Sequence, residues 1–192
     1  GSSSRMRASD AMRRTAAVSR DMALPGQAGA GAISPPMPLF NMTALRTALP
    51  RHGRLLGIDP GSKTLGLALT DVSLMIASPY GALRRDKLKR NAAEIAAIAA
   101  KEGAAGLVVG LPLLMDGSVG PAAQAARDWA EALSAATGLP AALWDERLSS
   151  AAVNRMLITE ADLSRARRAR AVDGAAAAWT LQAALDATRH AP

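Results

Sequence analysis

The chain has 192 residues, of which 49% are hydrophobic and only 3% aromatic; it has no cysteine and carries a formal net charge of +7. This length suits a single domain with an aliphatic core, and the lack of cysteine excludes disulfides, thiolate nucleophiles and thiolate metal sites. No apolar run approaches the roughly 20 residues of a membrane helix, and the positive charge favours a polyanionic partner because phosphate contacts release counterions.

The first 36 residues differ in composition from the rest of the chain. They contain five arginines among Ser, Ala and Gly and show no apolar periodicity, which predicts a disordered N-terminal extension. An Arg-rich, acid-poor segment also mimics a transit peptide, and whether residues 1–36 are native, a tag remnant or an upstream mis-start stays open. Residues 37–53 are expected to form a lead-in segment with a short helix from Thr43 to Leu49.

Residues 54–71 contain two short apolar runs, each ending at an acid, joined by a turn at Pro60-Gly61. This pattern predicts a β-hairpin whose first strand is buried on both faces and therefore central in a sheet. Asp59 ends that strand, where α/β proteins place ligands. The alternative is that Asp59 only caps the turn. Asp71, at the end of the second run, is interpreted as structural.

The remaining chain predicts a third strand, then alternating helices and strands. The third strand, 76–83, contains Pro79, which is typical of an edge strand. A meander followed by helical crossovers is typical of an α/β domain with a mixed sheet. The later elements are expected at 88–101 (helix, ending at Gly103), 106–112 (strand), 121–136 (helix, ending at Gly138), 141–144 (strand), Ser149 to about 157 (helix), and a last helix opened by Asp173.

Carboxylates follow or precede elements that should meet at one sheet edge. Asp59 ends the first strand, Asp145 and Glu146 end the fifth, and Asp173 begins the last helix. Clustered carboxylates repel one another unless a divalent cation lies between them, and Mg²⁺ prefers oxygen ligands. Two such ions about 4 Å apart can promote phosphodiester cleavage. The alternatives are a Glu146–Arg147 ion pair, a helix-capping role for Asp145, and an Asp173 that complements a helix dipole.

The loop Gly61-Ser62-Lys63-Thr64 superficially matches a phosphate-binding P-loop. The match fails because the required glycine spacing is missing and because the loop joins two strands rather than a strand and a helix. The hairpin also resembles that of the actin-like ATPases, but those proteins need a second, duplicated domain that this chain is too short to hold.

Four motifs together resemble the YqgF family of bacterial RNase H-like proteins, known as pre-16S rRNA nucleases and earlier as Holliday junction resolvases. The resemblance covers residues 54–188. The motifs, in order, are Leu56-Gly57-Ile58-Asp59-Pro60-Gly61 with Gly66-Leu67-Ala68; Val109-Gly110-Leu111-Pro112 with Met115-Asp116-Gly117; Asp145-Glu146-Arg147-Leu148-Ser149; and Val172-Asp173-Gly174-Ala175-Ala176.

The resemblance implies an RNase H-like domain over 54–188, with a five-stranded mixed sheet flanked by helices. It implies Asp59, Glu146 and Asp173 as catalytic, metal-binding carboxylates, with Asp145 as a possible substitute ligand and Mg²⁺ or Mn²⁺ as cofactor. Related junction resolvases carry a glutamate at the end of the fourth strand. Here that region lacks an acid, so the acid after the fifth strand must stand in.

The expected function is a cytoplasmic metal-dependent nuclease that processes the 5′ end of the 16S rRNA precursor in ribosome biogenesis. The alternatives are a Holliday junction resolvase acting on branched DNA and a non-catalytic nucleic-acid-binding module. The basic segments 84–90 and 165–170 are candidate phosphate contacts; a solvated helix start is the other interpretation of 84–90. The cleavage position, the preferred metal and the choice between monomer and homodimer stay open.

Overall fold

The computed structural model describes the backbone of residues 38–147 and 165–189, and the side chains of 38–147 and 174–189. The predicted N-terminal extension and the helix expected from Ser149 fall outside these ranges. The elements are α1 (Met42–Ala48), β1 (Arg54–Pro60), β2 (Thr64–Thr70), β3 (Ala77–Arg84), α2 (Leu88–Glu102), β4 (Ala104–Leu111), α3 (Pro121–Thr137), β5 (Ala141–Asp145) and α5 (Arg165–Ala187).

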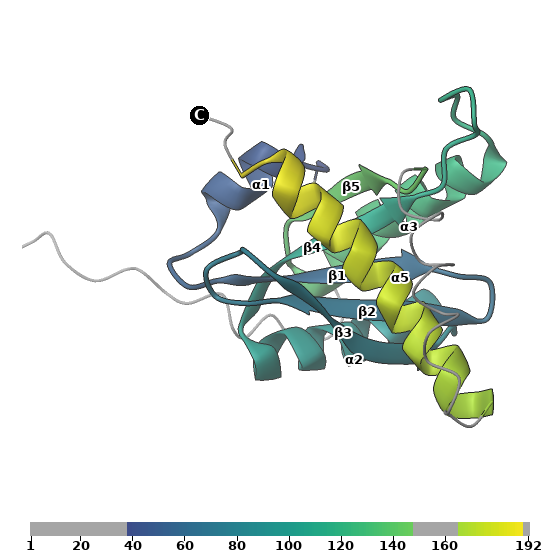
Figure 1. Ribbon diagram of the computed structural model, residues 1–192, viewed down its shortest axis with the longest axis horizontal. Coiled ribbons are helices and arrows are strands. Elements are labelled where there is room, and N and C mark those ends of the chain that lie inside the picture. The colour runs from purple at the N-terminus through teal and green to yellow at the C-terminus, as the bar shows by residue number, and fades with distance from the viewer. Residues whose placement is uncertain (1–37, 148–164, 190–192) are drawn as a thin grey trace, which may run out of the picture. The chain divides into compact units, whose positions relative to one another are not determined.

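The five strands form one mixed sheet in the order β3-β2-β1-β4-β5 (Figure 1). The first three strands are an antiparallel meander, and β4 and β5 continue the sheet parallel to β1. This arrangement confirms the predicted RNase H-like fold with β1 at the centre of the sheet. The predicted edge strand is β3, where Pro79 lies next to an irregularity in the pairing with β2.

Helices cover both faces of the sheet because strand side chains alternate between them. On one face, α2 and α3 pack on Leu56, Ile58 and their neighbours in β2 and β4. On the other face, α1 and α5 pack on Leu55, Val108 and Ala142. The longest helix, α5, crosses this second face diagonally (Figure 1). Every helix in the described part of the chain is too short or too polar to cross a membrane.

Helix α5 lies very close to the sheet because small residues meet at the contact. A β-carbon on Gly57 of β1 would lie 3.0 Å from the Leu181 β-carbon and 3.4 Å from the Ala177 carbonyl oxygen. Farther along, Gly174 approaches the backbone of Gly81 in β3. The small residues of the last helix and of the facing strands therefore allow this close approach.

The ends of the elements follow the expected signals, with one exception. Helices α2 and α3 end at Gly103 and Gly138, whose φ angles are +69° and +71°, a conformation that glycine adopts without strain. The exception is the last helix, which begins at Arg165 rather than at Asp173. The prediction that Asp173 opens this helix is wrong, because the basic segment before Asp173 is already helical from Arg165.

Candidate functional site

Asp59 and Glu146 lie at the same edge of the sheet although 87 positions separate them in sequence. Strands β1, β4 and β5 run parallel, so their carboxyl ends meet at one edge, where Leu111 of β4 pairs with Asp145 of β5. Asp59 follows Gly57 by two residues, and alternation places both on the face that α5 covers. We call this edge the carboxylate edge.

Gly110 provides the space that Glu146 occupies. It lies near the end of β4, and a β-carbon added there would overlap the Glu146 carboxyl group. The Oε1 atom of Glu146 is buried. The fourth strand lacks an acid at its end, and the carboxyl group of Glu146, the residue that follows β5, lies beside Gly110 instead.

Burial and the nearby charge of Asp59 raise the pKa of Glu146 to about 8. The side chains of Asp59 and Glu146 are hydrogen-bonded to each other, so at neutral pH the protonated Glu146 carboxyl donates to the Asp59 carboxylate. Two carboxyl groups held this close cannot easily both be ionised. Such an arrangement is typical of functional sites and is energetically costly where a residue has only a structural role.

Asp145 has a different partner from Glu146. Its carboxylate accepts hydrogen bonds from the Arg147 guanidinium at 2.6 and 2.9 Å, and from the Arg147 backbone N–H at 3.0 Å. This pairing lowers the pKa of Asp145. The alternative ion pair in which Arg147 bonds to Glu146 is thus replaced by one with Asp145. Nearby, Asp116 stabilises its own turn by accepting hydrogen bonds from the backbone N–H and the hydroxyl of Ser118.

The side chain of Asp173 lies outside the described residues, but its backbone position in α5 is defined. Position 173 precedes Ala177 by four residues, so both share a face of the helix and lie about 6 Å apart along its axis. Ala177 approaches Gly57, and Asp59 lies two strand residues, or about 6.6 Å, beyond Gly57.

The direction of α5 decides on which side of Ala177 position 173 falls. Gln182 accepts a hydrogen bond from the backbone N–H of Ala77 at the start of β3, whereas Gly174 approaches Gly81, farther along that strand. Strand β3 runs parallel to β1, so residues toward the start of α5 lie toward the carboxylate edge. Along the strand direction the backbone of position 173 therefore lies near the level of Asp59, while the neighbouring Gly174 lies over β3, two strands from β1.

The donor set at this edge fits a hard divalent cation. Asp59 and Glu146 offer carboxylate oxygens, the ligands that Mg²⁺ and Mn²⁺ prefer, and their mutual repulsion would be relieved by a cation between them. Among the side chains that the structure describes, no three acids or histidines form a metal-binding group. The described side chains therefore supply two of the three carboxylates predicted from the sequence.

The basic segment 84–90 divides into residues with different partners. Arg85 donates hydrogen bonds to the carbonyl oxygens of Pro60 and Gly61 at 3.2 and 2.8 Å, and its guanidinium lies 5.7 Å from the ring centre of Trp129. It thereby fixes the turn that follows Asp59. Arg90 forms ion pairs with Asp86 and Glu94.

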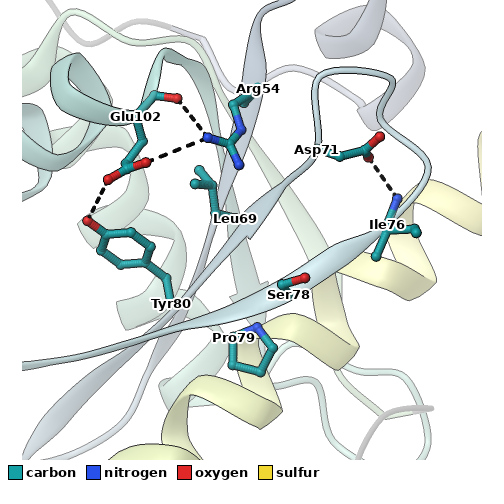
Figure 2. A pocket seen from close by; sticks show the side chains of 8 residues that line it. All are labelled: Arg54, Leu69, Asp71, Ile76, Ser78, Pro79, Tyr80 and Glu102. Atoms are coloured by element: carbon teal, nitrogen blue, oxygen red, sulfur yellow. Dashed lines mark hydrogen bonds and ion pairs between the residues drawn. The ribbon is translucent and has the colours of Figure 1, made fainter.

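A hollow of about 480 Å³ lies at the opposite end of the central strands (Figure 2). Arg54, at the start of β1, forms an ion pair with Glu102 at 3.6 Å, and Glu102 also accepts a hydrogen bond from the Tyr80 hydroxyl at 3.0 Å. Asp71 accepts from the backbone N–H groups of Met75 and Ile76, as expected of a structural residue. In this hollow Arg54 and Glu102 pair with each other and Asp71 is held by backbone N–H groups, so we do not assign the active site to this end.

Two residues of the carboxylate edge were not singled out as functional by the sequence. Gly110 makes room for Glu146, and the missing acid in Val109-Gly110-Leu111-Pro112 is the signal that could have revealed it. Arg85 was grouped with the other basic residues, and no sequence pattern distinguishes its inward contacts from those of a solvated arginine.

Comparison with known proteins agrees with the sequence motifs. Curated relatives named "Putative pre-16S rRNA nuclease" are 70% identical in Gluconacetobacter diazotrophicus (79% of this chain, 99% of the relative) and 64% identical in Acidiphilium cryptum (78% and 94%). A solved structure of T. thermophilus RuvC with Holliday junction substrate has a TM-score of 0.45 and 19% identity (72% and 97% covered), a likeness too distant for a functional argument.

The family model that matches residues 53–187 is described as "RuvX: Holliday junction resolvase". Its match spans all four motifs from which the sequence predicts membership under the name YqgF, and that prediction is confirmed. The chain belongs to the RuvX family.

Proposed function

We propose that this protein is a metal-dependent nuclease, a hydrolase of phosphodiester bonds, that processes the 5′ end of the 16S rRNA precursor in the cytoplasm. Its family and its highly identical relatives support this function. The observation that carries the proposal is the contact between Asp59 and Glu146, two acids from distant segments held together above Gly110.

In this proposal Asp59 and Glu146 hold a divalent cation, Mg²⁺ or Mn²⁺. Such a cation supplies an activated water and stabilises the charge of the leaving oxygen. Glu146 retains a proton at neutral pH when no cation is bound, so it must release this proton to become a ligand. Burial of Glu146 against Gly110 fixes its carboxyl group toward Asp59.

We assign Asp173 as the third carboxylate. Its support is the register of α5, in which position 173 shares a face with Ala177 and lies at the level of Asp59. Asp145 is a weaker candidate ligand because Arg147 already engages both of its carboxylate oxygens. We therefore place Asp145 in a supporting role: it orients Arg147 and the start of the segment that carries Glu146.

Cleavage of branched DNA is a second candidate, favoured by the description of the family model as a Holliday junction resolvase. A two-carboxylate site does not discriminate RNA from DNA, because the same chemistry cleaves both backbones. A third candidate, a binding module without catalysis, keeps the fold but gives no reason for the Asp59–Glu146 contact.

The test is cleavage of a 16S precursor fragment and of a four-way DNA junction, each with Mn²⁺, with Mg²⁺ and in EDTA. We expect metal-dependent cleavage of the RNA and at least about a hundredfold loss in Asp59→Asn, since even residues behind metal ligands are worth 10–100-fold. An unchanged thermal midpoint shows that the variant is folded. Cleavage of the junction alone would favour the second candidate, and no product from either substrate would favour the third.

A further inference from the structure

Among the side chains that the structure describes, two cations without protein partners lie on one side of the proposed site. On the β5 side, Arg147 is neutralised by Asp145. On the β3 side, Arg84 ends its strand and Lys63 lies in the turn between β1 and β2, and both are exposed. Within residues 38–147 and 174–189, neither of these two side chains has a hydrogen-bond or ion-pair partner. We call Arg84 and Lys63 the edge cations.

Strand register places Arg84 on the same face as the acids. Arg84 pairs with Thr64, and Asp59 pairs with Gly66, two residues along the same strand β2. Thr64 and Gly66 share a face by alternation, and so do their partners. Arg84 is thus two strands away from Asp59 and two residues farther out, with roughly 12 Å between the α-carbons by strand geometry.

Lys63 is held beside Arg84 by the backbone. The N–H of Arg85 donates to the carbonyl oxygen of Lys63 at 2.9 Å, which extends the pairing of β2 and β3 past the end of the ladder. Arg85 also anchors the carbonyl oxygens of the same turn. The turn that carries Lys63 is therefore fixed relative to Asp59.

We propose that the edge cations contact the sugar–phosphate backbone of the substrate strand on one side of the cleaved linkage, so that this strand leaves the site past the ends of β2 and β3 at the carboxylate edge. The inference rests on the proposed nuclease function for the position of the cleaved bond. Two exposed cations on fixed backbone, beside a pair of acids that would repel phosphate without a cation, suit a polyanion that spans both groups. Arg85 and Arg90 take no part because protein partners occupy them.

The test measures binding in EDTA, so that it does not depend on cleavage. Fluorescence anisotropy with a labelled RNA hairpin that has a single-stranded extension, and with a DNA of the same sequence, gives the slope of log affinity against log salt. The variant is Lys63→Ala with Arg84→Ala. The matched control is Lys101→Ala with Arg127→Ala, two exposed cations elsewhere that change the net charge equally.

We expect the magnitude of the slope to be about 1.4 to 1.8 smaller in the edge variant, the value for two lost phosphate contacts. In the control the magnitude of the slope should change by less than half of that. Lys63→Arg with Arg84→Lys should restore the wild-type slope. Equal slopes for the edge variant and the control, or no binding by the wild type, would overturn the inference. If the wild type cleaves neither substrate but its salt slope still differs from that of the edge variant, the nuclease function alone would be rejected.

Discussion

The two ends of the central strands treat charge in opposite ways. At the start of β1, Arg54, Glu102 and Tyr80 form a set in which a cation and a hydroxyl satisfy one acid. At the other end of the same strand, Asp59 meets Glu146, and the pKa of Glu146 rises to about 8. Glu102, by contrast, has a lowered pKa because Lys101 and Tyr80 hydrogen-bond to it.

This difference indicates which end does chemistry. Paired charges stabilise a fold or cost it little, and the hollow lined by Arg54 and Glu102 needs no ligand to satisfy them. Two partly buried acids in contact destabilise the metal-free protein. A fold keeps such an arrangement where another group, here a cation, is to be bound.

The largest effect is expected from filling the space above Gly110, because this would remove the contact that distinguishes the carboxylate edge from the other end of β1. In Gly110→Ala the added β-carbon overlaps the Glu146 carboxyl group, so this group must leave Asp59. We expect cleavage to fall by at least about a hundredfold, as for loss of a metal-site residue, and stability to fall by about 1 to 3 kcal/mol. Single-turnover cleavage and urea denaturation measure the two effects.

Gly106→Ala is the matched control on the same strand. Its β-carbon would lie 3.0 to 3.1 Å from methyl groups of Leu55, Leu45 and Leu49, so it also crowds the core but leaves Glu146 in place. We expect it to destabilise the fold while most of the activity of the folded protein remains. If both variants lose activity in proportion to stability, Gly110 has no specific role.

The contact of Asp59 with Glu146 can be tested by measuring how stability depends on pH in EDTA. The pKa of Glu146 is about 8 in the folded protein and 4.5 for the ordinary side chain. The folded state therefore holds a proton that the unfolded state releases, and stability should fall as pH rises from about 4.5 to 8. In Glu146→Gln this fall should shrink by roughly 2 to 4 kcal/mol.

Denaturant midpoints at several pH values between 4.5 and 8.5 check this expectation. Asp59→Asn should weaken the same dependence, because the charge of Asp59 contributes to the raised pKa of Glu146. A wild type with the same pH profile as Glu146→Gln would show that the two carboxyl groups do not face each other in solution.

A substitution at the other end of β1, where Arg54 pairs with Glu102, should have a much smaller effect on stability and cleavage. In Glu102→Gln the ion pair with Arg54 is lost, although the amide oxygen can still accept from the Tyr80 hydroxyl. The Arg54 and Glu102 side chains are 28% and 21% exposed, so we expect only a small loss of stability. Cleavage per folded molecule should be unchanged. A tenfold loss of cleavage would contradict the assignment of function to the other end.

Most of the fold follows from local signals in the sequence. The hairpin, the edge position of Pro79 and the helix ends at Gly103 and Gly138 are each set by residues within a few positions, and the structure shows all of them. The start of the last helix was placed wrongly because Asp173 is a good first-turn residue by itself. The preceding Ala- and Arg-rich segment favours helix equally well and extends it back to Arg165.

The site was only partly accessible to the same reasoning. Parallel strand order suffices to bring Asp59 and Glu146 to one edge. The choice between Asp145 and Glu146 depends on side-chain partners, since Arg147 pairs with the first and Gly110 accommodates the second. The inward contacts of Arg85 are with Pro60, Gly61 and Trp129, each more than 20 positions away, and no local pattern reveals them.

The smallest expected effect on stability is that of Asp71→Asn, and its dependence on pH is opposite in sign to that of Glu146→Gln. Asp71 accepts from Ser73 and from the backbone N–H groups of Met75 and Ile76, and these bonds lower its pKa from 3.8 to about 2. Its contribution to stability is present above pH 3.8 and lost as pH falls through 2. In Asp71→Asn the Oδ1 atom can keep its two backbone bonds, so near neutral pH we expect a loss under about 1 kcal/mol.

That loss should vanish toward pH 2, where the wild-type carboxylate becomes protonated, whereas the effect of Glu146→Gln appears above pH 4.5. Urea midpoints of both variants against the wild type from pH 2.5 to 8.5 compare them directly. If Asp71→Asn instead gained stability relative to the wild type as pH rises above 4.5, as expected for Glu146→Gln, the pH dependence of stability would arise from net charge. It would then not come from particular carboxyl groups. Opposite slopes at the two ends of the sheet require that one acid is held by donors and the other by a second acid.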